Sequence, residues 1–442
     1  MSKKKGAAGG TTVAAGLPSK KKNDEAWEFL FSKYDIVAEV DARGIFEITA
    51  DQINEVREAR LMTKFDHASN LPALFSTNNL AILPVTRGTY VIGRFEAYQS
   101  VNYDSTVTTR LFPANPTLET IDYTDLTSES AVLNCAYVTE ILNDLAGEPV
   151  LPTVSGRMST KSFNFQVSHP TGSHTISVNN SQCEVDGGYE GENVFLLIEA
   201  KNEQVKDFLV RQLYYPYRLW QGKIRKNVVP VFMTYSNDVF SFFKGEFQDL
   251  NDYNSFRLVE QRNYVITSES EAITLADIQH IADTVTIVPE PNAPFPQADS
   301  FTKIVDLLTL LHSGGNAPIS KDFVTANYAF VERQTQYYSA GGRYLGLIND
   351  GLGSYTLTRE GQELMSLPHK QKILGLVERI LAHDVFNKVF HLYIQQAGTL
   401  TNADVVAIMR TSPIRNITQT TVGRRAQSVK KWIEWIADRV EE

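Results

Sequence analysis

The sequence predicts an α/β core with a mixed central sheet flanked by helices, followed by a mainly α-helical C-terminal region. Three observations predict this fold class. Strand-like segments follow one another from Ser162 to Phe247, with a single long helical stretch at about 203–220. Four prolines between positions 289 and 296 then interrupt any helix or central strand. Beyond them the apolar residues recur with the period of short amphipathic helices.

The order of these segments predicts several parts, because 442 residues are too many for one compact core. The predicted parts are a disordered basic tail (1–26), an N-terminal module (27–125), the α/β core (126–288), a Pro-rich linker (289–300) and the helical region (301–442). The module is expected to hold a helix at 51–62 and a strand pair at 80–84 and 90–95, and a helix at 131–145 opens the core.

Composition excludes some classes of protein and leaves others open. No apolar run reaches the roughly 18–20 residues of a membrane span, and the start of the chain lacks the apolar segment of a secretion signal. Cys135 and Cys183 form no metal or redox motif, which predicts a reducing cytoplasm. The net charge is −9, yet residues 1–22 and 410–431 each hold six cations and no acid. Such segments suit a polyanionic partner or, equally, a solvated surface.

One segment carries a candidate catalytic cluster. Residues 182–202 are predicted to form a β-hairpin, with Gly187 and Gly188 in its turn and 194–201 as its second strand. Because side chains alternate along a strand, Glu199 and Lys201 share one face, and pairing brings Asp186 close to them. Two carboxylates can hold a hard cation such as Mg²⁺, and a lysine can orient or deprotonate water and stabilise negative charge. The alternative is an edge-strand salt bridge, which contributes roughly 0–1 kcal/mol.

With the helix that follows, this hairpin resembles the PD-(D/E)XK nuclease superfamily, whose core is a helix, a hairpin with Asp and (Asp/Glu)-x-Lys, and a second helix. The resemblance implies catalytic roles for Asp186, Glu199, Lys201 and Gln212, with Tyr215 in support. It also implies a Mg²⁺ held by Asp186, Glu199 and the backbone carbonyl of Ala200. The position before Asp186 holds Val185 in place of the family's proline. The acid that the family often contributes from its first helix is not identified firmly by the sequence. Glu140, within 131–145, is the candidate, with a solvent-facing glutamate as the alternative. Glu184 could serve instead as an additional ligand or could face water.

The region after position 301 is expected to read DNA. Helices at 303–312 and 320–327, a longer segment at 329–348 and a strand within 355–361 resemble a winged helix, and helices at 385–397, 401–409 and 420–440 follow. In such readers basic residues grip phosphates beside the major groove. The predicted DNA-binding residues are Arg333, Arg343, Arg424, Arg425, Lys430 and Lys431. A dimerisation surface is the alternative role for this region.

Together these features predict a type II restriction endonuclease that cuts double-stranded DNA at a specific sequence or methylation state with Mg²⁺. No phosphate-binding loop of the Gly-x-x-x-x-Gly-Lys-Ser/Thr type is present, which argues against an NTP-driven motor. Cations of the N-terminal module are expected to line the DNA cleft: Arg57, Arg60, Lys64, Arg87 and Arg94. A structure-specific repair nuclease and a DNA-binding regulator with a relict nuclease fold remain alternatives. Monomer and homodimer both stay open.

Overall fold

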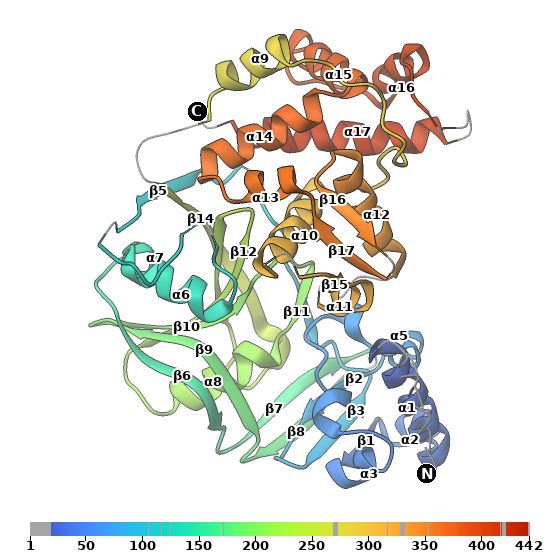
Figure 1. The fold of residues 1–442 in the computed structure, drawn as a ribbon. Coiled ribbons are helices and arrows are strands. Elements are labelled where there is room, and N and C mark those ends of the chain that lie inside the picture. The colour runs from blue at the N-terminus through green and yellow to red at the C-terminus, as the bar shows by residue number, and fades with distance from the viewer. Residues whose placement is uncertain are drawn as a thin grey trace, which may run out of the picture.

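The computed structural model describes residues 19–440 apart from 105, 116, 124, 171, 268–272, 316, 328–331, 352, 416 and 418–420. The structure combines a large central sheet with a small N-terminal module, at the lower right of the view, and a group of C-terminal helices at its top (Figure 1). The chain is therefore mixed α/β with a helical C-terminal region, as the sequence predicts. No helix in the described part of the chain combines the length and apolar character of a membrane span.

Seven strands form the central sheet in the order β5-β14-β13-β12-β10-β9-β6. They are β5 (Thr109–Pro113), β6 (Leu151–Ser159), β9 (Gln182–Glu190), β10 (Val194–Lys201), β12 (Asn227–Ser236), β13 (Val239–Phe247) and β14 (Phe256–Thr267). The pairs β10–β12 and β14–β5 are parallel and the other neighbours are antiparallel. The predicted mixed sheet is confirmed.

Helices cover both faces of this sheet. They are α6 (Glu129–Val138), α7 (Ile141–Ala146) and α8 (Arg211–Gln221). Leu196 and Ile198 of β10 pack with Leu133 of α6 on one face. On the other face Leu197 packs with Trp220 of α8. Because side chains alternate along a strand, Glu199 and Lys201 follow Leu197 onto the α8 face, as predicted.

The predicted turn at Gly187-Gly188 is wrong. β9 continues through both glycines to Glu190, and the chain reverses over residues 191–193. Gly188 is required by packing, because a Cβ there would lie 2.8 Å from both Phe195 Cζ and Val154 Cβ. The glycine therefore lets three neighbouring strands approach closely beside Asp186.

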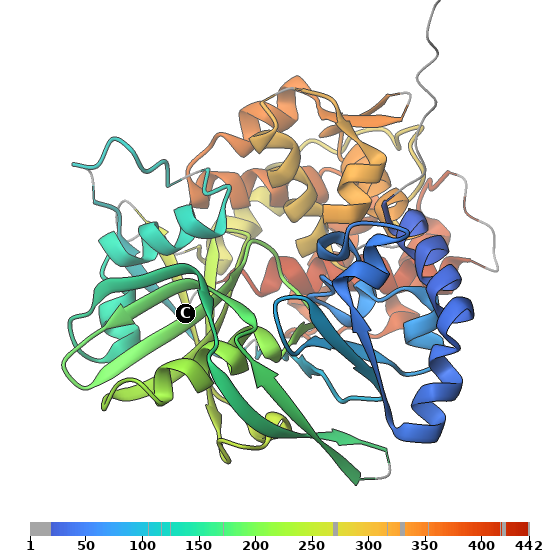
Figure 2. The same cartoon turned by 90° about the horizontal axis from the view of Figure 1, so that it is seen from below.

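The helix predicted at about 203–220 begins later, at Arg211. Residues before it form β11 (Asp207–Leu209), which pairs with β4 (Tyr98–Ser100). This pairing across a hundred positions overrides the local helical pattern. A further hairpin, β7 (Ser162–His169) with β8 (Gly172–Asn179), lies between the central sheet and the N-terminal module (Figures 1 and 2).

The N-terminal module packs helices around a three-stranded antiparallel sheet of order β1-β3-β2. Its elements are α1 (Ser19–Tyr34), α2 (Ile36–Arg43), β1 (Ile45–Thr49), α3 (Ala50–Asn54), α4 (Ala59–Met62), a 3₁₀ turn (Ala68–Asn70), α5 (Ala73–Thr77), β2 (Ala81–Pro84) and β3 (Thr89–Gly93). The strand pair is as predicted, whereas the predicted helix at 51–62 is split into α3 and α4. Of the predicted tail 1–26, residues 1–18 lie outside the described residues. The remainder is helical in α1, where Ala26 is buried, so the predicted disorder is wrong for that part.

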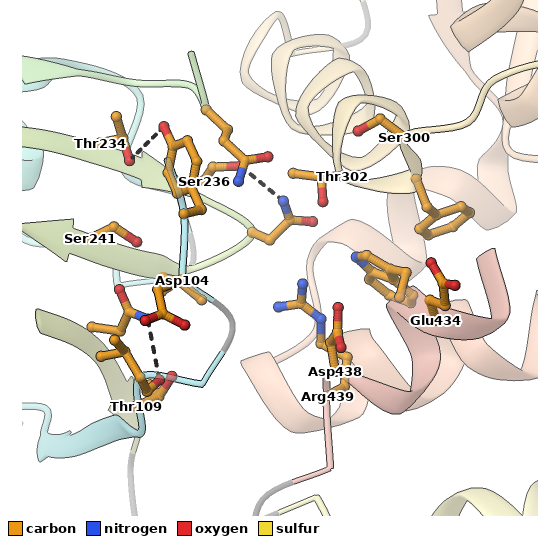
Figure 3. A pocket seen from close by; sticks show the side chains of 18 of the residues that line it. Asp104, Thr109, Thr234, Ser236, Ser241, Ser300, Thr302, Glu434, Asp438 and Arg439 are labelled. Carbon is orange, nitrogen blue, oxygen red and sulfur yellow. Dashed lines mark hydrogen bonds between the residues drawn. The ribbon is translucent and has the colours of Figure 1, made fainter. Parts of the chain in front are cut away.

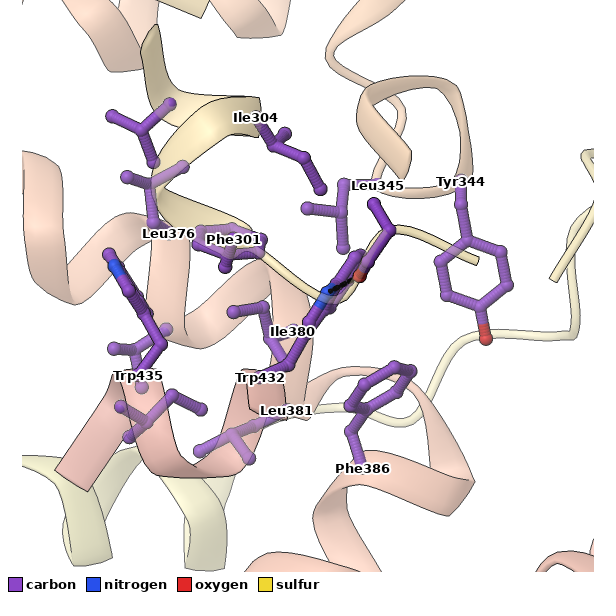
Figure 4. Packing of buried hydrophobic residues seen from close by; sticks show 14 of the residues in the cluster. Phe301, Ile304, Tyr344, Leu345, Leu376, Ile380, Leu381, Phe386, Trp432 and Trp435 are labelled. Atoms are coloured by element: carbon purple, nitrogen blue, oxygen red, sulfur yellow. Dashed lines mark hydrogen bonds between the residues drawn. The ribbon is translucent and has the colours of Figure 1, made fainter. Parts of the chain in front are cut away.

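The C-terminal region has eight helices and a three-stranded sheet among its described residues. They are α10 (Phe301–Ser313), β15 (Ile319–Ser320), α11 (Lys321–Asn327), α12 (Glu332–Tyr344), β16 (Ile348–Gly351), β17 (Ser354–Leu357), α13 (Arg359–Met365), α14 (His369–Leu381), α15 (Asp384–Gln395), α16 (Asn402–Thr411) and α17 (Val422–Ala437). Figure 4 shows Phe301 of α10 beside Trp432 and Trp435 of α17 in the shared core, and the Phe301 and Trp432 ring centroids lie 4.8 Å apart.

The Pro-rich segment has no regular structure, as predicted, but it is packed. Phe295 and Ala298 are buried in the C-terminal core, and the Trp432 indole N–H donates to the Ala298 carbonyl at 2.8 Å. Helix α9 (Leu275–Thr284), which precedes this segment, also packs Ile278 against the C-terminal core. The C-terminal unit therefore begins, by packing, ahead of the prolines.

Candidate nuclease site

The structure brings Asp186, Glu199 and Lys201 together where β9 and β10 separate. Pairing between the two strands ends at Gly187 and Ile198. Beyond that point the Asp186 carboxylate accepts a hydrogen bond from the Ala200 backbone N–H at 2.9 Å. Lys201 Nζ lies 2.5 Å from Glu199 Oε1 and donates to the Ala200 carbonyl at 3.1 Å. The three predicted side chains and the predicted carbonyl thus form one cluster.

Helix α8 contributes Gln212 to this cluster. Its side-chain amide donates to Glu199 Oε1, and Gln212 Oε1 is buried with no hydrogen-bond partner among the described residues. Tyr215, also considered from sequence, instead donates its hydroxyl to the Pro84 carbonyl at 2.9 Å. Gln212 therefore belongs to the cluster, whereas Tyr215 fastens α8 to the N-terminal module.

A third acid beside the cluster is Glu129 of α6, which the sequence did not single out. Glu129 begins α6 and lies 3.8 Å from Lys201 Nζ. The candidate considered from sequence, Glu140, caps α7 and is exposed, with φ 65°. Glu184 is also exposed and pairs with Arg157 at 3.3 Å. A carboxylate one helical turn before the apolar positions of α6 was the only available signal for Glu129.

Burial and charge set the protonation of the cluster. Burial raises the pKa of Glu199 to about 7, although the Lys201 ammonium opposes the rise. Burial likewise raises the pKa values of Asp186 and Glu129. Burial lowers the pKa of Lys201, but Glu199 and Glu129 outweigh it and leave that pKa raised. Lys201 is therefore a cation at neutral pH, suited to stabilising negative charge more than to accepting a proton.

The donor set fits a hard divalent cation. Asp186, Glu199 and the Ala200 carbonyl supply oxygen atoms, and the unpartnered Gln212 Oε1 lies beside them. No group of three or more His, Cys, Asp or Glu side chains in the described residues forms a metal site. Mg²⁺ commonly uses one or two carboxylates plus waters and substrate phosphates, so two carboxylates suffice for it.

The cluster opens into a cleft of about 980 Å³. Its second wall is the N-terminal module, which contributes Arg60, Lys64 and Arg87 of the five cations predicted for the cleft. Arg57 and Arg94 are held by Asn23 and Asp41 at 2.6 Å each. Besides Lys201, the core contributes Arg157 and Arg211 to the cleft, and the sequence did not single out these two arginines as cleft residues.

The six predicted DNA-binding residues lie elsewhere, since none lines the cleft. Arg333 is in α12, and its side chain is outside the described residues. Arg343 lies in the last turn of α12 and pairs with Asp350 at 3.0 Å. The other four are on α17: Arg424, Arg425, Lys430 and Lys431. Lys431 and Lys430 approach Glu434 at 2.7 and 3.8 Å, whereas Arg424 is exposed.

Comparison with known proteins follows the three parts of the structure. Three family models match the chain, and each is described as a domain of unknown function. They are DUF6996 at residues 24–92, DUF6997 at residues 93–265 and DUF7226 at residues 303–441. No curated protein and no solved structure matches the chain. The boundaries of the matches fall at the end of β3, at the end of the central sheet and in the first turn of α10.

Proposed function

We propose that the chain is a Mg²⁺-dependent endonuclease of the PD-(D/E)XK type that cuts double-stranded DNA in the cytoplasm. The observation that carries the proposal is the convergence of Asp186, Glu199 and Lys201 at the edge of a cleft with cations on both walls. A buried carboxylate pair beside a lysine is costly to stability, and such groups gather where catalysis needs them. An edge-strand salt bridge is exposed, whereas the Glu199 side chain is only 7% exposed.

The chain's own residues divide the work of phosphodiester hydrolysis. Asp186, Glu199 and the Ala200 carbonyl would hold Mg²⁺, which supplies charge neutralisation at the phosphate and an acidified water. Gln212 orients the Glu199 carboxylate through its hydrogen bond. The Lys201 ammonium neutralises charge that develops on the phosphate oxygens. Glu129, 3.8 Å from Lys201 Nζ, places a further carboxylate beside the ammonium.

The cations of the cleft support DNA as the substrate. Arg60 and Lys64 keep 71% and 73% of their side-chain surface exposed, so they can contact a ligand. Arg87 and Arg211 form no ion pair with an acidic residue of the described chain. Lysine and arginine side chains along a groove contact phosphates irrespective of sequence, and they position the duplex without reading it.

The C-terminal unit supplies recognition in this proposal. The order α10, β15, α11, α12, β16, β17, with a sheet of order β15-β17-β16, agrees with a winged helix. In that order α12 takes the place of the helix that enters the major groove. One catalytic centre cuts one strand at a time, so double-strand cleavage needs a second copy or a second encounter.

The test is digestion of methylated and unmethylated plasmids with purified protein and Mg²⁺, followed by sequencing of the ends. Lys201→Met is the inactive variant. Lys223→Met is its control, because Lys223 is exposed and lies over the Trp220 ring, outside the cleft. Discrete fragments that need Lys201 support restriction. Cutting confined to flaps, junctions or ends favours a repair nuclease, and equal behaviour of wild type and Lys201→Met refutes catalysis by this cluster.

A further inference from the structure

The turn that follows Lys201 is fastened by a residue of the C-terminal unit. Lys303, in the first turn of α10, contacts Glu203 Oε2 at 2.9 Å and donates to the Gln204 carbonyl. Both partners directly follow β10, and Glu203 lines the same cleft as Lys201. The turn that follows the strand with the catalytic residues is therefore held by Lys303, a residue about a hundred positions further along the chain.

The contact is buried and joins two strands of the central sheet. The Lys303 and Glu203 side chains are 16% and 13% exposed. Asp306, 3.5 Å from Lys303, accepts a hydrogen bond from Ser236 at the end of β12. One lysine thus links α10 to the ends of the parallel strands β10 and β12. Figure 3 shows the polar pocket beside this contact, which is lined by Thr234 and Ser236 of β12 and by Thr302 of α10.

Such a cluster is not the most stable way to fill a domain interface. Burying one ammonium and two carboxylates costs hydration free energy, and apolar residues of similar volume often stabilise a protein as well or better. Ionic contacts instead define geometry, because they hold particular atoms at particular distances from one another. Here the fixed atoms are the carboxylate of Glu203 and the backbone carbonyl of Gln204, two and three residues beyond Lys201.

We propose that Lys303 is a positioning residue for the catalytic centre. By holding the turn 202–205 in place, Lys303 sets the position of the Lys201 side chain at the end of β10. The proposal rests on the proposed nuclease function. Tyr103 adds a second fastening, because its hydroxyl accepts the Val205 backbone N–H at 3.0 Å. Without Lys303 the turn keeps that bond but loses both contacts nearer to Lys201.

A second interdomain cluster provides a matched comparison. Lys372 of α14 pairs with Asp238 at 2.9 Å, and His369 contacts the same carboxylate at 2.8 Å. Like Lys303, whose side chain is mostly covered, Lys372 is a lysine with little exposed surface that joins the C-terminal unit to the central sheet. Asp238, however, lies in the turn between β12 and β13 and does not line the cleft. The two lysines therefore share an interface role, and only one is attached to β10.

The experiment compares full-length Lys303→Met and Lys372→Met. Hydrogen exchange over residues 199–206 needs no substrate, and Tb³⁺ luminescence reports the affinity for a trivalent stand-in for Mg²⁺. Cleavage gives kcat and KM separately. Both variants are expected to lower the unfolding midpoint. Lys303→Met alone is expected to speed exchange in the turn and to lower kcat by about 10- to 100-fold, the range of outer-sphere substitutions, with KM unchanged.

Equal exchange, Tb³⁺ affinity and kcat in the two variants would overturn the proposal. If exchange is faster in Lys303→Met but the wild type cleaves no DNA, the result would support the role of Lys303 in holding the turn 202–205 and would refute the nuclease function. If Lys303→Met does not fold, Glu203→Gln removes the ion pair from the other side and leaves the Gln204 contact in place. Glu203→Gln is then expected to speed exchange in the turn, and unchanged exchange would overturn the proposal.

Discussion

Replacing Gly188 by alanine tests whether close strand packing holds the candidate site in shape. The new Cβ would lie 2.8 Å from Phe195 Cζ and from Val154 Cβ. Carbon atoms pack comfortably at about 3.5–4.0 Å, so these atoms must separate by about 0.7 Å or more. Val154 Cβ moves only with its own strand, and Phe195 is 1% exposed with its ring 5.3 Å from that of Trp220. Neither neighbour can yield freely, and overpacking of this kind costs about 1–3 kcal/mol.

The same substitution should loosen the site, because Gly188 pairs with Leu197 two residues from Glu199. Urea unfolding followed by tryptophan fluorescence measures the stability, and hydrogen exchange at Ala200 measures the bond to Asp186. Gly222→Ala is the control. Gly222 has a helical backbone (φ −85°, ψ −4°), and its added Cβ would meet nothing nearer than the Arg218 carbonyl oxygen at 3.8 Å. That variant should be neutral or more stable by about 0.4–1 kcal/mol. A Gly188→Ala protein as stable as wild type, with unchanged Ala200 exchange, would refute the packing argument.

Three further outcomes are expected. Lys201→Met should lower kcat by roughly 100- to 1,000-fold, the range seen when a charge-stabilising group is lost. Binding to DNA in the presence of Ca²⁺ should persist, and a loss of binding would contradict a role for Lys201 in the chemical step. The double variant Arg60→Ala/Arg87→Ala should weaken binding to all DNA sequences alike. Because two phosphate contacts are lost, the slope of log affinity against log salt concentration should fall by about 1.8. An unchanged slope would mean that DNA does not bind in this cleft. Burial lowers the pKa of His383 to about 4, so the unfolded chain binds the extra proton and stability falls as pH drops from about 6.5 towards 4. The loss between pH 7 and 5 is about 2 kcal/mol, and His383→Phe should abolish that part of the acid dependence in urea titrations.

The sequence was informative where local pattern decides structure. The alternation in β10 placed Leu196 and Ile198 on one face and Glu199 and Lys201 on the other, as the structure has them. The amphipathic pattern at 420–440 predicted a helix, and the structure has α17 there with Trp432 fully buried. Strong periodicity of apolar residues over a strand or helix is enough for such predictions.

Non-local contacts limited the rest. The Gly187-Gly188 pair predicts a turn locally, because the crowding of Gly188 by Val154 and Phe195 arises only when β6 and β10 are in place. Glu129 was missed because its distance to Lys201 depends on how α6 crosses the sheet. The contact of Lys303 with Glu203 joins two units whose docking no local pattern encodes.

The position of β5 has a consequence for the order of assembly during translation. β5 is the first strand of the central sheet to leave the ribosome, yet its neighbour in the sheet is β14, the last to be made. The backbone N–H and C=O groups of β5 therefore stay without their β14 hydrogen-bond partners until more than 140 further residues have been synthesised. Chains fold from the N-terminus as they emerge, and unpaired strands are prone to associate with other chains. A nascent chain halted before Phe256 should thus expose this edge and depend on chaperones that bind extended segments.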